Sequence, residues 1–294
     1  MHVFKPMRFG DVIDKTFRLA LGNLKNYLKI FAVFYGVLFL IIGLISLKIY
    51  SIYNNAQNLE YSLFFNDNLN IIVILGIIGV ISAIILSTFG SGMTTDLFSK
   101  SFLGEYWDFR NSFLYVKGKF WSIFVSSIIG VLVVLGGILC FFVGVYPATI
   151  LISCVIPALI NEDLTGVGSV KRSFELTKNK FWNLFGSFIL FSFLTSALGF
   201  IYQIFISIFS VVVASTPKFI ASSGTHISIL TILVYLIFFI VTVLYICVVA
   251  ALSTAYYVVQ YFNQRIKFEN FGTEVLPQNS IGNGENLPDS AGEE

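Results

Sequence analysis

The chain of 294 residues is 56% hydrophobic and only 12% charged, and its formal net charge is +2. A soluble domain carries about 25% charged residues, so this composition excludes an ordinary water-soluble protein. The apolar residues also fall in long uncharged runs, which are typical of membrane spans. The sequence therefore predicts an all-α polytopic membrane helix bundle that lies in a lipid bilayer and has no nucleic-acid partner.

The N-terminal region does not have the pattern of a cleavable signal peptide. Asp11 and Asp14 precede the first apolar run, whereas a signal peptide has a short basic start followed at once by a brief apolar stretch. We therefore expect the chain to keep its N-terminus and to place an amphipathic helix over residues 1–27, ahead of the first span.

The first half of the membrane region predicts four spans. Two of them lie over residues 28–50 and 71–89. The run 120–160 has no charge, and as one helix it would extend about 60 Å, twice the roughly 30 Å hydrocarbon core. We therefore predict two spans within it. The turn between them is placed at Gly144 and Pro147 or, alternatively, at the pair Gly136-Gly137.

The second half predicts two further spans. The run 181–215 is uncharged but too long for one upright span, so we place a span over 182–204. The remainder, as far as Pro217, is expected to lie along the far interface. The last span is predicted over 227–258, which gives about six spans in total.

Basic residues predict the orientation, because Lys and Arg are enriched on the cytoplasmic side of membrane proteins. With the N-terminus in the cytoplasm, only Lys48 and Lys218 fall outside, and the other 16 of the 18 basic residues fall inside. This count predicts a six-span domain over 28–262 and a cytoplasmic C-terminal segment over 263–294. From residue 273 onward that segment has five acids and no base, as in a disordered acidic tail.

Three stretches of the chain echo one another, at residues 17–27, 113–124 and 174–185. The last two align without a gap as Phe, followed by Lys-x-Lys-Phe-Trp-x-(Ile/Leu)-Phe, and the first matches weakly. Each stands where an amphipathic segment runs into a span. We therefore predict an internal repeat, in which a cytoplasmic amphipathic helix leads into a pair of spans. In the second block the apolar stripe is predicted to pass through Phe102, Tyr106, Phe109, Phe113, Val116 and Phe120.

Basic residues beside these stripes form the candidate site. In one interpretation the amphipathic helices only pack against the bundle and the headgroups. In the other they recognise an anionic phospholipid or a protein partner. The spacing does not separate the two, and the contact residues in the second are Lys117, Lys119, Arg172, Lys178 and Lys180. Trp121 and Trp182 stand at the cytoplasmic ends of spans, where amphipathic rings favour the headgroup level, and are predicted as interfacial anchors.

Patterns that carry catalysis are missing from the sequence. His2 and His226 lie on opposite sides of the predicted membrane, and no zinc-protease, serine-hydrolase or phosphate-loop motif occurs. Cys140, Cys154 and Cys247 sit in apolar runs and are expected to be packed thiols. A catalytic pair could be built from interfacial acids, but we expect these to cap helices or pair with cations: Asp11, Asp14, Asp96, Asp108, Glu162, Asp163 and Glu175. We predict no catalytic residue, no metal and no cofactor.

Three segments resemble the membrane-domain family of glycerophosphoryl diester phosphodiesterases. Residues 8–19 resemble the opening segment of that family, and 170–182 resemble its R-S-x-x-L-T-x-x-x-(F/W) signature. Ala255-Tyr-Tyr and Arg265-Ile-Lys-Phe-Glu269 resemble its closing segment. The resemblance covers most of residues 8–272 and implies a polytopic bacterial membrane protein. The family takes its name from fusions to a soluble phosphodiesterase domain, which we do not expect after residue 272, so the resemblance does not imply that activity.

These observations favour a non-enzymatic scaffold or regulatory module of the cytoplasmic membrane that positions an unidentified membrane or cytoplasmic protein. The alternative is a carrier or binder of lipids or small molecules without ion coupling, because internal repeats are common in transporters. Ion-coupled transport is disfavoured, since no Asp, Glu, Lys, Arg or His falls at the middle of a predicted span. A membrane enzyme that acts on lipid headgroups through the interfacial acids is the third hypothesis.

Overall fold

The structure is a computed structural model that describes residues 5–55, 61–139, 144–178, 181–223, 229–269 and 271. Within these ranges every element of regular secondary structure is a helix, as predicted. A chain in lipid must satisfy its backbone hydrogen bonds internally, and helices do this within a single segment. Some predicted features lie outside the described residues, namely His2, Cys140, Lys180, His226 and the acidic tail.

The first long hairpin begins with α2 (Leu24–Phe31) and α3 (Val37–Asn55), which are joined by the π-helical turn η1 (Ala32–Gly36) into one rod. The chain then returns through α4 (Tyr61–Leu103). With 43 residues, α4 extends about 65 Å, roughly twice the thickness of the hydrocarbon core. The helix is therefore too long to lie wholly within the hydrocarbon core, and part of it must extend beyond the core.

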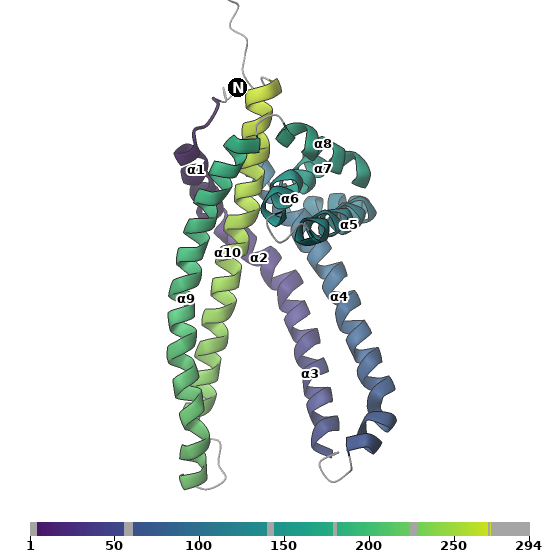
Figure 1. Ribbon diagram of the computed structural model, residues 1–294, viewed down its shortest axis with the longest axis vertical. Helices are drawn as coiled ribbons and strands as arrows, with labels where there is room; N and C mark the ends of the chain where they lie inside the picture. The colour runs from purple at the N-terminus through teal and green to yellow at the C-terminus, as the bar shows by residue number, and fades with distance from the viewer. Residues whose placement is uncertain are drawn as a thin grey trace, which may run out of the picture.

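The second long hairpin consists of α9 (Phe181–Ser223) and α10 (Ile229–Glu269). Figure 1 shows the two hairpins as two pairs of legs that diverge away from the end where α1 lies. The prediction that the chain leaves the span after residue 204 and lies along the interface up to Pro217 is wrong. The helix α9 is continuous for 43 residues, because no charge or turn sequence interrupts the apolar run at that point.

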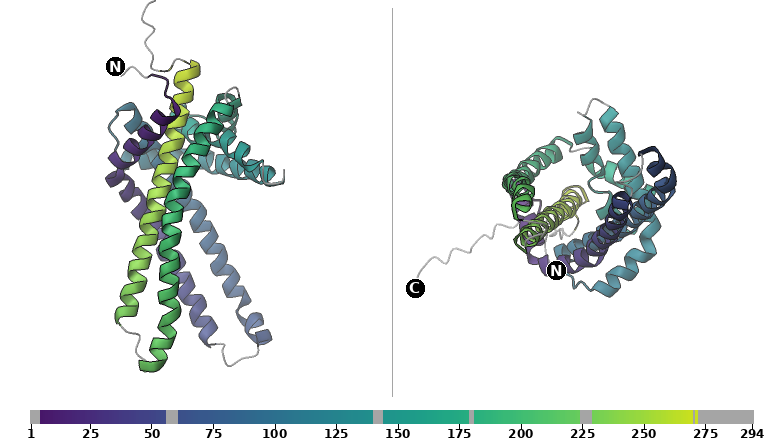
Figure 2. Two further views of the ribbon diagram at one scale, coloured as in Figure 1. Left: turned by 60° about the vertical axis from the view of Figure 1, so that its left-hand side comes forward. Right: turned by 90° about the horizontal axis from the view of Figure 1, so that it is seen from below.

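The remaining helices form a head at one end of the legs. These are α1 (Phe9–Gly22), α5 (Phe109–Leu139), α6 (Val145–Ile152), α7 (Val155–Asn161) and α8 (Gly166–Lys178). Figures 1 and 2 show α5 crossing the direction of the legs, with α6, α7 and α8 gathered against it. The start of α1 and the end of α10 both lie at the head, so the described chain begins and ends on the same side of the molecule.

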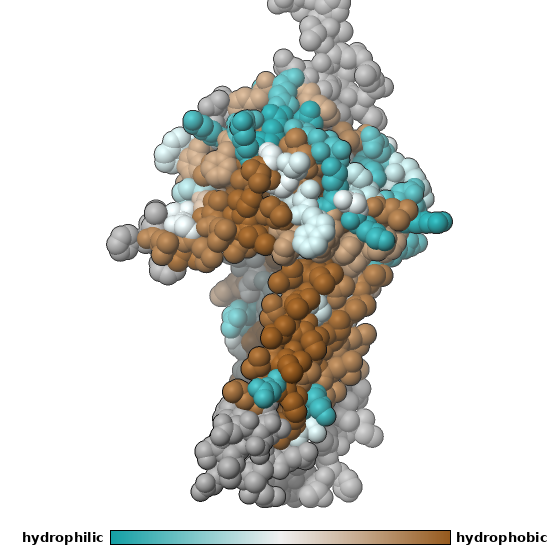
Figure 3. Space-filling model, turned by 90° about the vertical axis from the view of Figure 1, so that its right-hand side faces the viewer, coloured by the Kyte–Doolittle hydropathy of each residue, from teal (hydrophilic) through white to brown (hydrophobic). Residues whose placement is uncertain are grey.

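Five of the described helices are long and apolar enough to cross a membrane, and the chain is a multi-pass membrane protein. On α3, about two thirds of each of Leu40, Leu44 and Leu47 is exposed. A soluble protein rarely exposes so much continuous apolar surface, whereas lipid would cover it. Figure 3 shows hydrophobic residues along the legs, while hydrophilic residues gather on the head.

The run 120–160 differs from the predicted pair of spans. The first member, α5, passes through Gly136 and Gly137 without a break, so the alternative turn is not used. Gly144 is the N-cap of α6, and Pro147 lies in its first turn, close to the preferred turn position. The second member is divided at Ser153 and Cys154 into α6 and α7. Together they are too short for an upright span. Of the five described helices long and apolar enough to cross a membrane, four belong to the two long hairpins, and the fifth, α5, lies across them in the head. The four helices of the legs keep both ends of the described chain on one side, where about six spans were predicted.

The stripe predicted through Tyr106 is also interrupted. The helix α4 ends with Gly104 in the left-handed region at φ 77°, where glycine has no Cβ to clash. The N–H of Glu105 then bonds back to the carbonyl of Lys100 at 2.8 Å, as in a Schellman motif. Tyr106 is 89% exposed, and Trp107 is buried in its place. The amphipathic segment of the second block is therefore the first part of α5 itself.

The core lies where the head meets the legs. Phe102 of α4 stacks on Phe262 of α10 with ring centroids 4.5 Å apart, and Tyr27 of α2 stacks on Phe98 at 5.9 Å. The helix α1 packs against α10 and α4, and α5 packs against α4 and α8. Cys154 and Cys247 are buried free thiols, in agreement with their expected packing role.

Candidate functional site

A network of charged side chains joins the head helices, with Glu162 at its centre. Glu162 follows α7, and its carboxylate accepts a hydrogen bond from Arg172 Nε on α8 at 2.8 Å. It also accepts a hydrogen bond from the hydroxyl of Tyr261 on α10 at 2.9 Å. Arg265 Nε on α10 lies 3.6 Å from the same carboxylate. One acid therefore holds α7, α8 and α10 together.

Glu269 closes the network from the last residue of α10. It accepts hydrogen bonds from Arg265 Nε at 2.9 Å and from Arg172 Nη2. Two arginines and two carboxylates alternate, so their charges cancel, and each is only partly exposed. Partial burial lowers the pKa of Arg172, but its hydrogen bonds to Glu162 and Glu269 outweigh that effect and raise the pKa above its ordinary value. The network therefore stabilises the packing of α7, α8 and α10 in the head by electrostatic attraction.

All seven interfacial acids considered as catalytic candidates have a structural partner, as expected. Besides Glu162, Glu175 lies 4.0 Å from Arg172. Asp11 and Asp108 cap helix starts by accepting backbone N–H groups, and the others pair with cations: Asp14 with Arg18 at 2.9 Å, Asp96 with Lys100 at 3.1 Å and Asp163 with Lys119 at 2.7 Å. The hydrogen bond and charge of Lys119 lower the pKa of Asp163.

The five basic residues predicted to contact lipid or a partner differ in their ion pairing and in their exposure. Lys119 and Arg172 are engaged in the ion pairs just described. Lys117 and Lys178 are exposed, on α5 and α8, which pack against each other. Lys180 lies outside the described residues. Recognition by the exposed pair stays a prediction.

Trp121 and Trp182 occupy matching aromatic clusters. Trp121 stands edge-on to Phe120 and Phe124, with centroid separations of 5.5 and 5.8 Å. Trp182 stands edge-on to Phe181 and Phe185 at 5.7 and 5.8 Å. Both indoles are more than 70% exposed, as an interfacial anchor requires.

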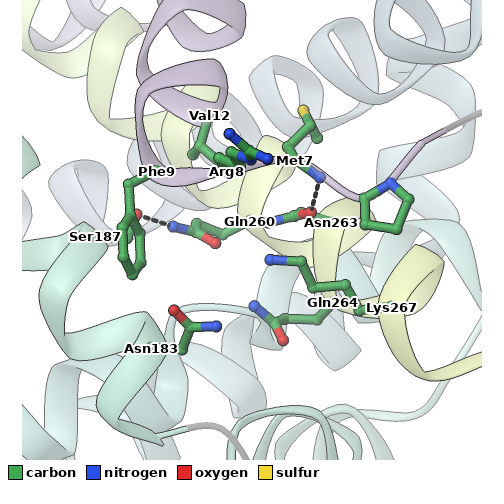
Figure 4. Close-up of a pocket in the computed structure, with 11 residues that line it drawn as sticks. Met7, Arg8, Phe9, Val12, Asn183, Ser187, Gln260, Asn263, Gln264 and Lys267 are labelled. Atoms are coloured by element: carbon green, nitrogen blue, oxygen red, sulfur yellow. Dashed lines mark hydrogen bonds between the residues drawn. The ribbon is translucent and has the colours of Figure 1, made fainter.

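A polar pocket of about 420 Å³ lies between the start of α1, the start of α9 and the last turns of α10. Figure 4 shows its residues from the three elements. The wall from α10 has Gln260, Asn263, Gln264 and Lys267 at spacings of three, four and seven residues, which places them on one face of the helix. The walls from α1 and α9 add Arg8, Phe9, Val12, Asn183 and Ser187, with Pro6 and Met7 from the segment before α1.

Some of the polar groups in this pocket satisfy one another. Gln260 donates to Ser187 Oγ and to Tyr256 OH, and the backbone N–H of Met7 donates to Asn263 Oδ1 at 2.9 Å. Gln264 is different, because its Oε1 is buried and has no hydrogen-bond partner within the structure. Among the described residues that line the pocket there are two cations, Arg8 and Lys267, and no carboxylate. The pocket is therefore both basic and incompletely satisfied.

Sequence analysis missed this pocket. Arg8 and Lys267 contribute to the predicted orientation and lie in segments that carry the family resemblance, but neither was predicted to line a pocket. The signal was present, since a polar stripe at helical spacing on an otherwise apolar helix is unusual. What the sequence does not show is that the starts of α1 and α9 lie against that stripe. The contact of Met7 with Asn263 joins residues 256 positions apart, and that of Ser187 with Gln260 joins residues 73 apart.

A second groove, of about 550 Å³, lies between α4 and α5. It is lined mainly by apolar side chains, including Ile81, Ile85 and Phe124, and Lys117 and Trp121 also contribute to its lining. This combination resembles what an acyl chain with an anionic headgroup would need.

Within the described part of the chain, no group of three or more His, Cys, Asp or Glu side chains is placed to hold a metal ion. No protein-family model, no curated protein and no solved structure matches this chain.

Proposed function

We propose that this protein is a non-enzymatic scaffold or regulatory module of the cytoplasmic membrane. The observation that supports the proposal is that the interfacial acids are engaged in structural contacts. All seven cap helices or lie beside cations, and Glu162 is tied to both Arg172 and Tyr261. Carboxylates held in this way stabilise the head as a platform and are not aimed at a common reacting centre.

Both termini are proposed to be cytoplasmic. The support is the predominance of Lys and Arg in the segments that make up the head, together with the location of the start of α1 and the end of α10 at that end. The two exposed tryptophans then mark the cytoplasmic headgroup level.

Membership of the glycerophosphoryl diester phosphodiesterase membrane-domain family is likewise proposed. Its three motif segments, though far apart in sequence, are found on α1, on α8 with the start of α9, and on the end of α10. These elements pack against one another in the head. Packing of the three motif segments into one head would explain why they lie outside the apolar legs. No phosphodiesterase activity is implied by this membrane module.

The scaffold proposal is tested by extracting the protein with its native lipid into polymer nanodiscs and identifying stoichiometric companions by mass spectrometry. We expect one protein partner, which is lost when the exposed cations are reversed in Lys117→Glu/Lys178→Glu. The matched control is Lys25→Glu, which reverses an exposed cation on α2. Absence of any stoichiometric partner, or its retention by the double variant, would contradict the proposal.

The groove between α4 and α5 favours a second candidate, a binder or carrier of lipid without ion coupling. Lys117 and Trp121 line this groove together with apolar side chains, as they would around an acylated anion. Reconstitution in liposomes with fluorescent phospholipids tests transport. Movement above the rate of protein-free liposomes supports a carrier, and an unchanged rate excludes one for the lipids used.

A further inference from the structure

The polar pocket at the end of α10 has a feature that its structural role does not explain. Gln264 is only 3% exposed, yet its side-chain oxygen has no hydrogen-bond partner in the described part of the chain. Buried polar groups in folded proteins are nearly always paired, because an unpaired one loses its bond to water and gains nothing. A group of this kind at the wall of a cavity is satisfied by whatever enters the cavity, either water or a ligand with a hydrogen-bond donor.

The charge of the pocket indicates the sign of that ligand. Arg8 and Lys267 line it from two different elements, and no acid is among its described lining residues. Asn183 adds an amide from the first turn of α9, where the positive end of the helix dipole favours an anion. The acid nearest in sequence to Arg8, Asp11, bonds the backbone N–H of Arg8 at 3.0 Å and serves as a helix cap.

We propose that this pocket binds the phosphate group of an anionic ligand. The guanidinium of Arg8 suits two phosphoryl oxygens at once, and the ammonium of Lys267 adds a point charge. Gln264 suits either part of a phosphate ester. Its oxygen accepts a bond from a ligand hydroxyl, and after rotation of the amide its NH₂ donates to a phosphoryl oxygen.

The size and place of the pocket are in keeping with a headgroup. Its volume of about 420 Å³ lies within the range of small-molecule sites, and Phe9 and Val12 give it an apolar side. Trp182, a predicted marker of the headgroup level, directly precedes Asn183 in the chain. The phosphate therefore comes either from a phospholipid with a small headgroup or from a soluble glycerol phosphate. The pocket contains neither Lys117 nor Lys178, the residues of the proposed partner contact, so the phosphate proposal can be tested independently of the scaffold proposal.

Binding is tested with the full-length protein in nanodiscs of phosphatidylcholine. In one arm sn-glycerol 3-phosphate is titrated into the buffer, and in the other a fraction of the lipid is replaced by phosphatidic acid. Thermal melting and native mass spectrometry report stabilisation and retained ligand. A response to glycerol phosphate assigns a soluble ligand, and a response to phosphatidic acid alone assigns a lipid headgroup. Both results support the pocket.

Matched substitutions then localise the response. We expect Arg8→Gln and Gln264→Leu to weaken the apparent affinity roughly tenfold or more, as loss of a charged or buried hydrogen bond does. Arg18→Gln removes an exposed cation of the same helix, and Gln203→Leu removes an exposed amide of α9, and both should bind as the wild type does. Lys267→Gln replaces Gln264→Leu if the latter fails to fold. No response in either arm, or equal binding by pocket and control variants, would overturn the proposal.

Discussion

Arg172 on α8 and Glu269 at the end of α10 are hydrogen-bonded although 97 residues separate them in the chain. The same guanidinium bonds Glu162, so one side chain joins the end of α7 to the end of the last helix. Both contacts lie in the head and not among the legs. The head is therefore held by directional polar bonds, while the legs present apolar surface.

The first prediction concerns the charged network around Glu162. Glu162→Gln keeps the size of the side chain but removes the charge that three partners use, so we expect a loss of about 1.5–3 kcal/mol of stability. Glu175→Gln is the control, since Glu175 is 54% exposed and 4.0 Å from Arg172, and it should cost less than about 1 kcal/mol. Thermal unfolding in nanodiscs measures both. Equal losses would show that the network does not stabilise the head.

A second prediction compares two adjacent glycines of α5. A Cβ on Gly137 would lie 2.6 Å from the backbone oxygen of Gly144, whereas a Cβ on Gly136 meets nothing within 4 Å. Gly137→Ala should therefore destabilise the protein by about 1–3 kcal/mol. Gly136→Ala should stabilise it by roughly 0.5–1 kcal/mol, since alanine favours the helix. Melting temperatures that move in the same direction would contradict the close approach of α5 and α6.

The ion pair of Asp163 with Lys119 predicts a pH dependence. In the folded protein the hydrogen bond and charge of Lys119 lower the pKa of the Asp163 carboxyl group below its usual 3.8. The contribution of the pair to folding stability is therefore fully present above pH 3.8 and is lost as the pH falls through the lower pKa of the folded protein. The melting temperature of the wild type should therefore fall more steeply in this acid range than that of Asp163→Asn. Parallel curves for the two proteins would show that the pair contributes no pH-dependent stability.

Tryptophan fluorescence tests the anchors. Trp121 and Trp182 are more than 70% exposed, whereas Trp107 is only 8% exposed. Lipids brominated near the headgroup should therefore quench much of the emission of the wild type. Quenching should decrease in Trp121→Phe and again in Trp121→Phe/Trp182→Phe, where Trp107 alone remains. Unchanged quenching in the double variant would place both indoles away from the lipid.

The sequence predicts the helical class and most of the legs, because long uncharged runs are a property of the residues themselves. It misplaces the run 120–160, since hydropathy gives the length of an apolar helix but not its direction. The direction of α5 follows from contacts such as Ser126 Oγ with Ser169 Oγ at 3.0 Å, which joins it to α8. Capping and i,i+4 pairing were within reach of sequence patterns, as Asp14 with Arg18 demonstrates.

The candidate site was less predictable. The cations chosen from the repeats were local in sequence, and two of them, Lys119 and Arg172, have acidic partners brought by other segments. The polar pocket depends on α1 and α9 lying against α10, and its unpaired Gln264 is visible only after that packing is formed. Periodicity could have indicated the stripe on α10, but not its cationic wall from Arg8.

The cytoplasmic location of the head is tested most directly by labelling single introduced cysteines in intact cells with a membrane-impermeant maleimide. Lys48→Cys lies on α3 in the legs, on the predicted outer side, and Lys178→Cys lies on α8 in the head, and both native lysines are exposed. The predicted result is labelling of Lys48→Cys in intact cells, and of Lys178→Cys only after the cells are opened, relative to the wild-type background. Labelling of Lys178→Cys in intact cells would contradict a cytoplasmic head.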